Sequence, residues 1–305
     1  LITCQSAFAD IYYPHVASTS KWDTEICAIN TGTGTITGTF EAFDNSGNAV
    51  SKNIAVELTS HARKQLTVGS QFSSPSSIGY IVFKTDSKNV VGYTKFYING
   101  KYRVAVPAIS EITTGDMYIS HIASTDKWWT GVSIVNTAST DKNLTIEFDD
   151  GTKKRFSLAA KAHKAFSIKS LFGNKSQPEF KSAVIKNAGG IVGLELFGSD
   201  NQLSGILLKN NTTKNMYYPH IASTDKWWTG IVAYNPSTTT CNLTIRPYTD
   251  TGMSLPTKSV SIDGKSKYIG SIKNLGISPE SGWFAIESTT AITGFELFGT
   301  SNSKL

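Results

Sequence analysis

The sequence predicts an all-β protein built of three tandem sandwich modules. Three observations point to this fold class: a motif that recurs about once per hundred residues, hydrophobic alternation with a period of two inside each copy, and turn residues between the alternating runs. The 305 residues also exceed one ordinary hydrophobic core and fit two or three domains of about 100–150 residues each. We place the modules at 10–112, 113–212 and 213–305.

The motif that opens each module is the strongest signal. It reads YYPHVASTSKW from Tyr12, YISHIASTDKWWTG from Tyr118 and YYPHIASTDKWWTG from Tyr217. Its period is far longer than the ~20–50 residues of solenoid repeats or propeller blades. The side chains that recur at fixed offsets are His15, His121, His220, Trp22, Trp128, Trp227, Asn30, Asn136 and Asn235. We expect these tryptophans to pack inside their modules and these histidines to form hydrogen bonds within their own loops, without converging.

Within each copy the pattern is typical of strands. In the second copy Leu144, Ile146 and Phe148 alternate with polar residues, which indicates one buried and one solvated face. Turn sequences such as Asn45-Ser46-Gly47 separate the runs. About seven short strands per copy, with turns every ~8–12 residues, predict immunoglobulin-like sandwiches. The alternative is a six-bladed propeller to which each copy contributes two blades.

The two ends of the sequence carry expectations of their own. The first residues, LITCQSAFAD, are similar to the tail of an export signal at 1–9 that ends in Ala7-Phe8-Ala9. A lipidated Cys4 and a true strand at the start are the alternatives. At the other end, the strand that follows ELFG in the second copy has no counterpart before Leu305. We therefore expect module 3 to lack its last strand, either because the sequence is a fragment or because a neighbouring chain donates that strand.

Composition and charge narrow the function classes. The net charge of +6 comes mainly from scattered lysines, which favours solubility and a weak attraction to anionic polysaccharide. No basic run tracks a nucleic-acid groove, and no segment reaches the ~18 apolar residues needed to span a bilayer. The cysteine spacing matches no metal or redox motif, so Cys27 and Cys241 are expected to be buried thiols.

The best candidate for ligand binding is the loop ASTDKWWTG. Adjacent residues of an extended chain point to opposite sides, so only one tryptophan of each pair can face the core. The second tryptophan is absent from the first copy, and we expect Trp129 and Trp228 to be exposed and able to stack on a sugar ring or contact a partner protein. Packing between modules is the alternative. Asp126 and Asp225 could bond sugar hydroxyls, although aspartate there is also an ordinary turn residue.

No catalytic, metal or cofactor site is predicted. Glu195 and Glu296 recur in ELFG, but no partner carboxylate recurs with them to divide acid and base roles. Motifs of serine hydrolases, zinc proteases and phosphate-binding loops are lacking from the sequence.

The succession WTGIVAYNPS, NLTIRPYTDTG and SGWFAIESTTAITGFELFG resembles an immunoglobulin-like repeat of secreted bacterial proteins, largely uncharacterised. The likeness runs from Tyr12 to Gly299 and is weakest in the first copy, where Asp23 and Glu25 replace tryptophan and glycine. The resemblance implies an exported, modular protein with no established chemistry.

These observations favour a non-catalytic array, secreted or at the cell surface, that makes weak multivalent adhesive contacts with a polysaccharide or a surface protein. One alternative is a carbohydrate-binding array, which could belong to a longer secreted enzyme. The other is the self-associating subunit of a filament that grows by strand donation.

Overall fold

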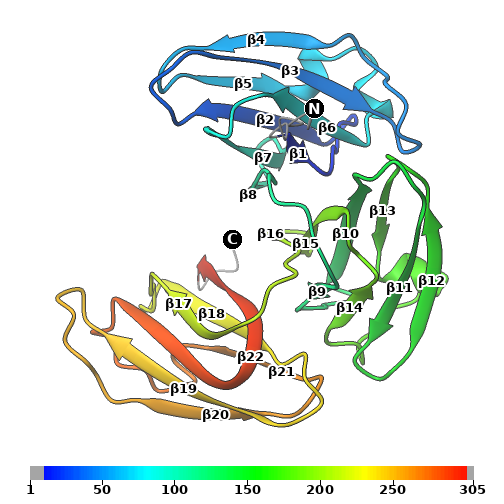
Figure 1. Cartoon of the computed structure of the whole chain (residues 1–305). Helices are drawn as coiled ribbons and strands as arrows, with labels where there is room; N and C mark the ends of the chain where they lie inside the picture. The colour runs from blue at the N-terminus through cyan, green and yellow to red at the C-terminus, as the bar shows by residue number, and fades with distance from the viewer. Residues whose placement is uncertain (1–9, 301–305) are drawn as a thin grey trace, which may run out of the picture.

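The computed structural model describes residues 10–300, so the predicted export signal at 1–9 and Cys4 lie outside it. The described residues form antiparallel sheets with three single-turn helices, and the all-β prediction is confirmed. Figure 1 shows three groups of strands, blue to cyan, green, and yellow to red, that follow one another along an arc. We call them modules 1, 2 and 3 in chain order.

Module 1 has two four-stranded sheets that enclose a core containing Ile26, Phe40 and Phe83. Its elements are β1 (Ile11–Tyr13), β2 (Asp23–Asn30), β3 (Ile36–Phe43), β4 (Ile54–Leu58), β5 (Arg63–Thr67), α1 (Val68–Gln71), η1 (Pro75–Ser77), β6 (Tyr80–Thr85), β7 (Val90–Ile98) and β8 (Tyr102–Pro107). The strand orders are β1-β6-β3-β4 and β5-β2-β7-β8. The two sheets therefore form a sandwich around one core.

Module 2 repeats this plan. Its elements are β9 (Met117–Ile119), β10 (Trp129–Asn136), β11 (Lys142–Phe148), β12 (Lys153–Leu158), β13 (His163–Ser167), η2 (Lys169–Phe172), β14 (Ala183–Lys186), β15 (Ile191–Gly198) and β16 (Leu203–Leu207). The sheets have the orders β12-β11-β14-β9 and β13-β10-β15-β16. Leu144, Ile146 and Phe148 all lie in the core between them, as their alternation predicts.

Module 3 has fewer but longer strands. Its elements are β17 (Thr213–Tyr218), β18 (Trp227–Tyr234), β19 (Cys241–Tyr248), β20 (Lys258–Ile262), β21 (Lys267–Ser271) and β22 (Trp283–Thr300). The long β22 pairs first with β17 and β19 and then with β18, so it belongs to both sheets.

A local difference in the sequence explains the long strand. In module 2, Asn187 and Gly190 have φ values of 62° and 87° and separate β14 from β15. Ser288 and Ala291 take the corresponding places in module 3, where the chain stays extended. A counterpart of β16 would lie beyond residue 300, so the expected loss of the last strand falls outside the described residues.

Three separate hydrophobic clusters fill the three sandwiches. The propeller alternative is wrong, because the two sheets of each module face each other across a closed core instead of standing side by side as blades. Cys27 and Cys241 are buried free thiols, as predicted. No helix among residues 10–300 is long and apolar enough to cross a membrane.

The recurring asparagine is buried in every module and ties two loops together. In module 2, Asn136 Nδ2 donates to the carbonyl oxygens of Thr140, Leu158 and Ala159 at 2.8, 3.2 and 2.9 Å, and its Oδ1 accepts from the backbone N–H of Ala138 at 3.0 Å. Asn30 and Asn235 make the same kind of contacts. This amide therefore supplies hydrogen bonds that the loop backbone cannot make by itself.

Asn136→Ala should lower the free energy of unfolding of module 2 by about 1–3 kcal/mol, because buried carbonyl groups lose their donor. Thermal and urea unfolding would measure the loss. Asn143→Ala, at an exposed position of the same module, is the matched control. Equal stability of the two variants would contradict the role given to Asn136.

Candidate functional site at the module junctions

The first two copies of the recurring motif lie where one module meets the next. The sheet β13-β10-β15-β16 has an inner face toward the module 2 core and an outer face turned away from it. On β10, Val132 and Ile134 point into the core, whereas Trp129 and Val135 pack in clusters that include residues of module 1. The module 1 side chains in these clusters are Tyr12, Ala17, Trp22, Phe43, Tyr80, Val82, Phe96, Val104, Val106 and Ile109. The contact between modules 1 and 2, which we call the first junction, thus has a hydrophobic interior separate from the cores of the two modules.

A half-open cavity of about 370 Å³ lies at this junction. Tryptophans from both modules, Trp22 and Trp129, line it, and its polar lining residues include His15 and Ser133. The other lining residues are Ala17, Phe96, Gly131, Val132, Ala165, Phe166, Ser167, Leu194 and Leu196. A volume of this size, at an interface between modules, falls in the range of small-molecule sites.

A chain of hydrogen bonds crosses the first junction beside the cavity. His163 Nε2 lies 2.7 Å from Ser133 Oγ, and His163 Nδ1 lies 2.7 Å from Asn45 Oδ1 of module 1. Ser133 Oγ also donates to the carbonyl oxygen of Pro14 at 2.7 Å. Asn45 belongs to the predicted hairpin turn, whose Gly47 has φ 84° and approaches the backbone of Lys161 too closely for a side chain.

The order serine, histidine, asparagine is similar to that of a hydrolase nucleophile, base and orienting residue. Three features argue for a structural role instead. Ser133 can give its one proton to Pro14. Burial, with the nearby His15, lowers the pKa of His163 to about 3, far from the near-neutral value of an effective general base. Ser133 also lies within the central strand β10, whose backbone N–H groups pair with β13 and β15, so this strand offers no oxyanion donors.

Two of the three motif histidines, His15 and His121, contact the next module. For these two, the predicted hydrogen bonds within their own loops are wrong. His15 stacks on His163 of module 2 with ring centroids 5.8 Å apart, and its buried Nδ1 has no partner among the described residues. His121 Nδ1 accepts from Lys267 Nζ of module 3 at 2.8 Å. Sequence reasoning missed both contacts because His163 and Lys267 lie outside the motif. His163 and Lys267 occupy equivalent positions in their modules, because each pairs with the residue that precedes the recurring asparagine. This equivalence is a signal that could have pointed to the two contacts.

The second junction uses different polar groups. Lys267 Nζ also donates to the carbonyl oxygen of Lys181, and burial lowers the pKa of this amine to about 8. The buried Glu195 has no hydrogen-bond partner for its carboxyl oxygens among the described residues, and burial raises its pKa, which the charge of Lys267 opposes. Around them, Phe197 packs on Phe295 with ring centroids 5.9 Å apart.

The tryptophans are not distributed as the sequence predicts. The first of each pair is not a core residue: Trp22 and Trp128 are half-buried, and Trp227 is 48% exposed. In each copy this tryptophan ends a turn in which the threonine three residues earlier bonds its backbone. Trp22 and Trp128 lie before their strands, where the alternation of faces does not apply, and Trp227 is the first residue of β18. The turn interpretation of Asp126 and Asp225 agrees with their exposure.

The second tryptophans are half-buried rather than exposed. Trp129 is the first residue of β10 and points to the outer face, where module 1 covers it. The indole of Trp228 packs on Gly230 and Gly299 of its own sheet. A Cβ atom on either glycine would clash with the indole. The sequence left two alternatives for Trp129, an exposed ligand-binding side chain and packing between modules. In the structure Trp129 packs between modules.

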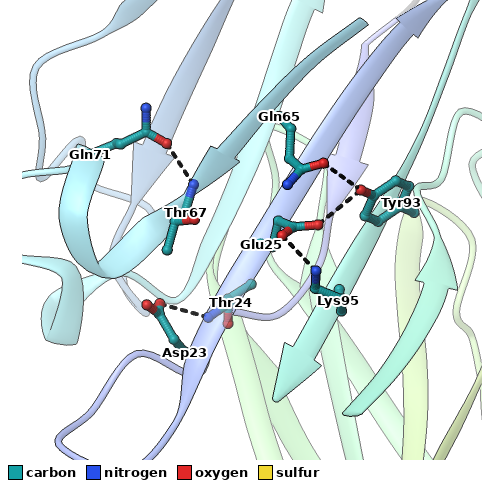
Figure 2. Close-up of polar contacts among 8 residues, drawn as sticks. All are labelled: Asp23, Thr24, Glu25, Gln65, Thr67, Gln71, Tyr93 and Lys95. Atoms are coloured by element: carbon teal, nitrogen blue, oxygen red, sulfur yellow. Dashed lines mark hydrogen bonds and ion pairs between the residues drawn. The ribbon is translucent and has the colours of Figure 1, made fainter. Parts of the chain in front are cut away.

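The corresponding outer face of module 1 is polar (Figure 2). Glu25 is only 6% exposed, and its carboxylate bonds Lys95 Nζ at 2.6 Å and accepts from the Tyr93 hydroxyl at 2.9 Å. The strand registers of modules 1 and 2 can be compared position by position. On the first strand of the face, Asp23 and Glu25 of module 1 correspond to Trp129 and Gly131 of module 2. On the neighbouring strand, Tyr93 and Lys95 correspond to Leu194 and Leu196. Module 1 thus carries charges where its neighbours carry an apolar docking face.

A scan against protein-family models and a search of curated proteins found no match to this chain. Residues 10–300 also hold no group of three histidine, cysteine or acidic side chains placed to bind a metal ion.

The first junction should weaken in acid. Burial lowers the pKa of His15 to about 4 and that of His163 to about 3, whereas an unfolded histidine titrates near 6.5. Their contribution is complete above pH ~6.5 and is lost as the pH falls toward 4, on the order of 2 kcal/mol for each histidine at pH 5.

The variant His15→Phe should therefore lose less stability between pH 7 and pH 5 than the wild type, which unfolding midpoints at a series of pH values would measure. Ser133→Ala keeps both imidazoles and should retain the wild-type slope. A His15→Phe slope as steep as that of the wild type would exclude His15 as an acid-sensitive group.

Proposed function

We propose that this protein is a non-catalytic structural array, exported to the cell surface or medium, that holds adhesive β-sandwich modules in a fixed order. One observation carries the proposal: what recurs in the sequence is the means of joining one module to the next. His15 and His121, with Phe96 and Phe197 beside them, lie at the two junctions.

The packing supports a stiff rather than a loosely linked array. The first junction buries two apolar clusters and a chain of hydrogen bonds, and Tyr80 of module 1 donates to the Lys161 carbonyl of module 2 at 2.8 Å. Apolar burial of this kind is typical of interfaces that do not come apart in solution. A curved, stiff array presents its surfaces at set distances, so weak contacts with one polymer add together.

Export and the choice of partner rest on the sequence. The segment before Asp10 is similar to the end of an export signal, and the chain resembles a repeat of secreted bacterial proteins. The net charge of +6 favours anionic polysaccharide or another acidic surface as the partner.

A second candidate function is the binding of a small ligand in the cavity of the first junction. The observation that favours it is the pair Trp22 and Trp129 on the wall of one cavity of about 370 Å³. An indole face can stack on a sugar ring or on an aromatic ring. This hypothesis moves the carbohydrate-binding alternative from the exposed loops into the junction.

Replacing Trp129 by Asp and Leu196 by Lys gives module 2 the residues that module 1 has at these positions. The change removes about 1.5–3 kcal/mol of apolar burial at the buried Leu196, removes part of the indole packing of the half-buried Trp129, and places charges in the junction. We expect solution X-ray scattering to show a larger radius of gyration, with the strand content unchanged by circular dichroism. Val91→Asp, at a side chain of module 1 that is 51% exposed, is the control, and scattering curves that coincide for all three proteins would contradict a stiff junction.

Ligand binding in the cavity can be measured by tryptophan fluorescence and calorimetry against a panel of oligosaccharides and aromatic compounds. Trp129→Ala should weaken any binding by about five- to thirtyfold, because the ligand loses a stacking surface worth about 1–2 kcal/mol. Trp228→Ala is the matched control, since Trp228 does not line the cavity. Equal affinity in the two variants would exclude the cavity as the site.

A further inference from the structure

The end of module 3 that carries the third motif is open to solvent. Tyr217 is 70% exposed and Trp227 is 48% exposed, and Pro219 and His220 are exposed as well. His220 lies over the half-buried Phe298 with ring centroids 5.2 Å apart. We call this set of five residues the open end.

The equivalent residues of the other modules are covered. Tyr12 is 7% exposed and Pro14 is buried against module 2, and Tyr118 contacts Tyr234 of module 3 with ring centroids 6.1 Å apart. Their burial follows from docking, because the same motif in module 3 folds in the same way and is exposed.

The docking geometry is already assembled at the open end. His15 lies 5.5 Å from Phe96 and His121 lies 5.5 Å from Phe197, measured between ring centroids, close to the value for His220 and Phe298 in module 3. A surface that is preorganised in its bound shape binds with a smaller loss of conformational entropy.

From this continuity with two internal junctions we propose that the open end docks the outer sheet face of a further β-sandwich module of the same repeat type. The occupant has an apolar face with tryptophan and leucine or phenylalanine at the positions of Trp129, Leu194 and Leu196. The inference rests on the proposed array function and adds its partner and direction of growth.

The outer face of module 1 does not fit as the occupant. Docking there would bury the ion pair of Glu25 and Lys95, whose polar atoms are already satisfied by each other and by Tyr93 (Figure 2). Burying a charged pair costs more than it returns unless new polar partners meet it, whereas the open end offers mainly aromatic rings. Module 1 therefore acts as the closed end of the array, in the way that a terminal repeat with a polar outer face caps a solenoid.

The test gives module 1 the docking face that it lacks. A variant with Asp23→Trp, Glu25→Gly, Tyr93→Leu and Lys95→Leu carries the module 2 residues, so the open end of one chain can dock on module 1 of the next. Such a head-to-tail contact does not close on itself and produces chains. Sedimentation over micromolar to millimolar concentrations should show a monomeric wild type and a variant whose mean mass rises several-fold with concentration.

Adding His220→Asp and Trp227→Ser to the variant should return it to the monomer. A folded variant that stays monomeric throughout, or oligomers that persist after these two changes, would overturn the proposal. Oligomers of the wild type would overturn the closed role of module 1. The milder pair Glu25→Gly and Lys95→Leu serves if the fourfold variant does not fold.

The scattering experiment on the first junction is independent of this one. An array that is stiff but gains no partner would refute the docking inference alone, and a flexible array would refute the proposed function.

Discussion

The burial of an apolar outer sheet face against the preceding module is the constraint on which the molecule depends. A sandwich core can cover only the inner faces of its two sheets, and modules 2 and 3 carry large apolar side chains on an outer face as well. Trp129, Leu194 and Leu196 would be exposed in an isolated module 2. The arc in Figure 1 follows from covering these faces, whereas the outer face of module 1 carries the ion pair of Glu25 and Lys95 in place of large apolar side chains.

The two junctions are both mainly apolar, but they contain different hydrogen-bonded polar groups. Asn45 and Pro14 satisfy His163 and Ser133 at the first junction, whereas His121 and the Lys181 carbonyl satisfy Lys267 at the second. A buried donor without its acceptor is costly in a low dielectric. Module 1 therefore offers polar partners that fit module 2 and that would leave Lys267 of module 3 without the acceptors it has at the second junction.

Much of the fold could be predicted because its signals are local. Alternation along Leu144, Ile146 and Phe148 and the turn at Gly47 depend on neighbouring residues only. The tryptophan predictions failed for a reason that is equally physical. Whether Trp22 or Trp129 is buried depends on where β2 and β10 begin and on which module packs against each tryptophan, and neither is encoded within the motif.

The sequence by itself determined the all-β class, the recurring motif and the buried thiols, since these depend on period-two patterning and on residue type. Only the tertiary structure decided that the motif of one module contacts the next module. It brought His15 to His163 and His121 to Lys267, pairs separated by well over a hundred residues. Contacts between modules arise from packing whole sheets against loops, and no spacing along the chain reports them.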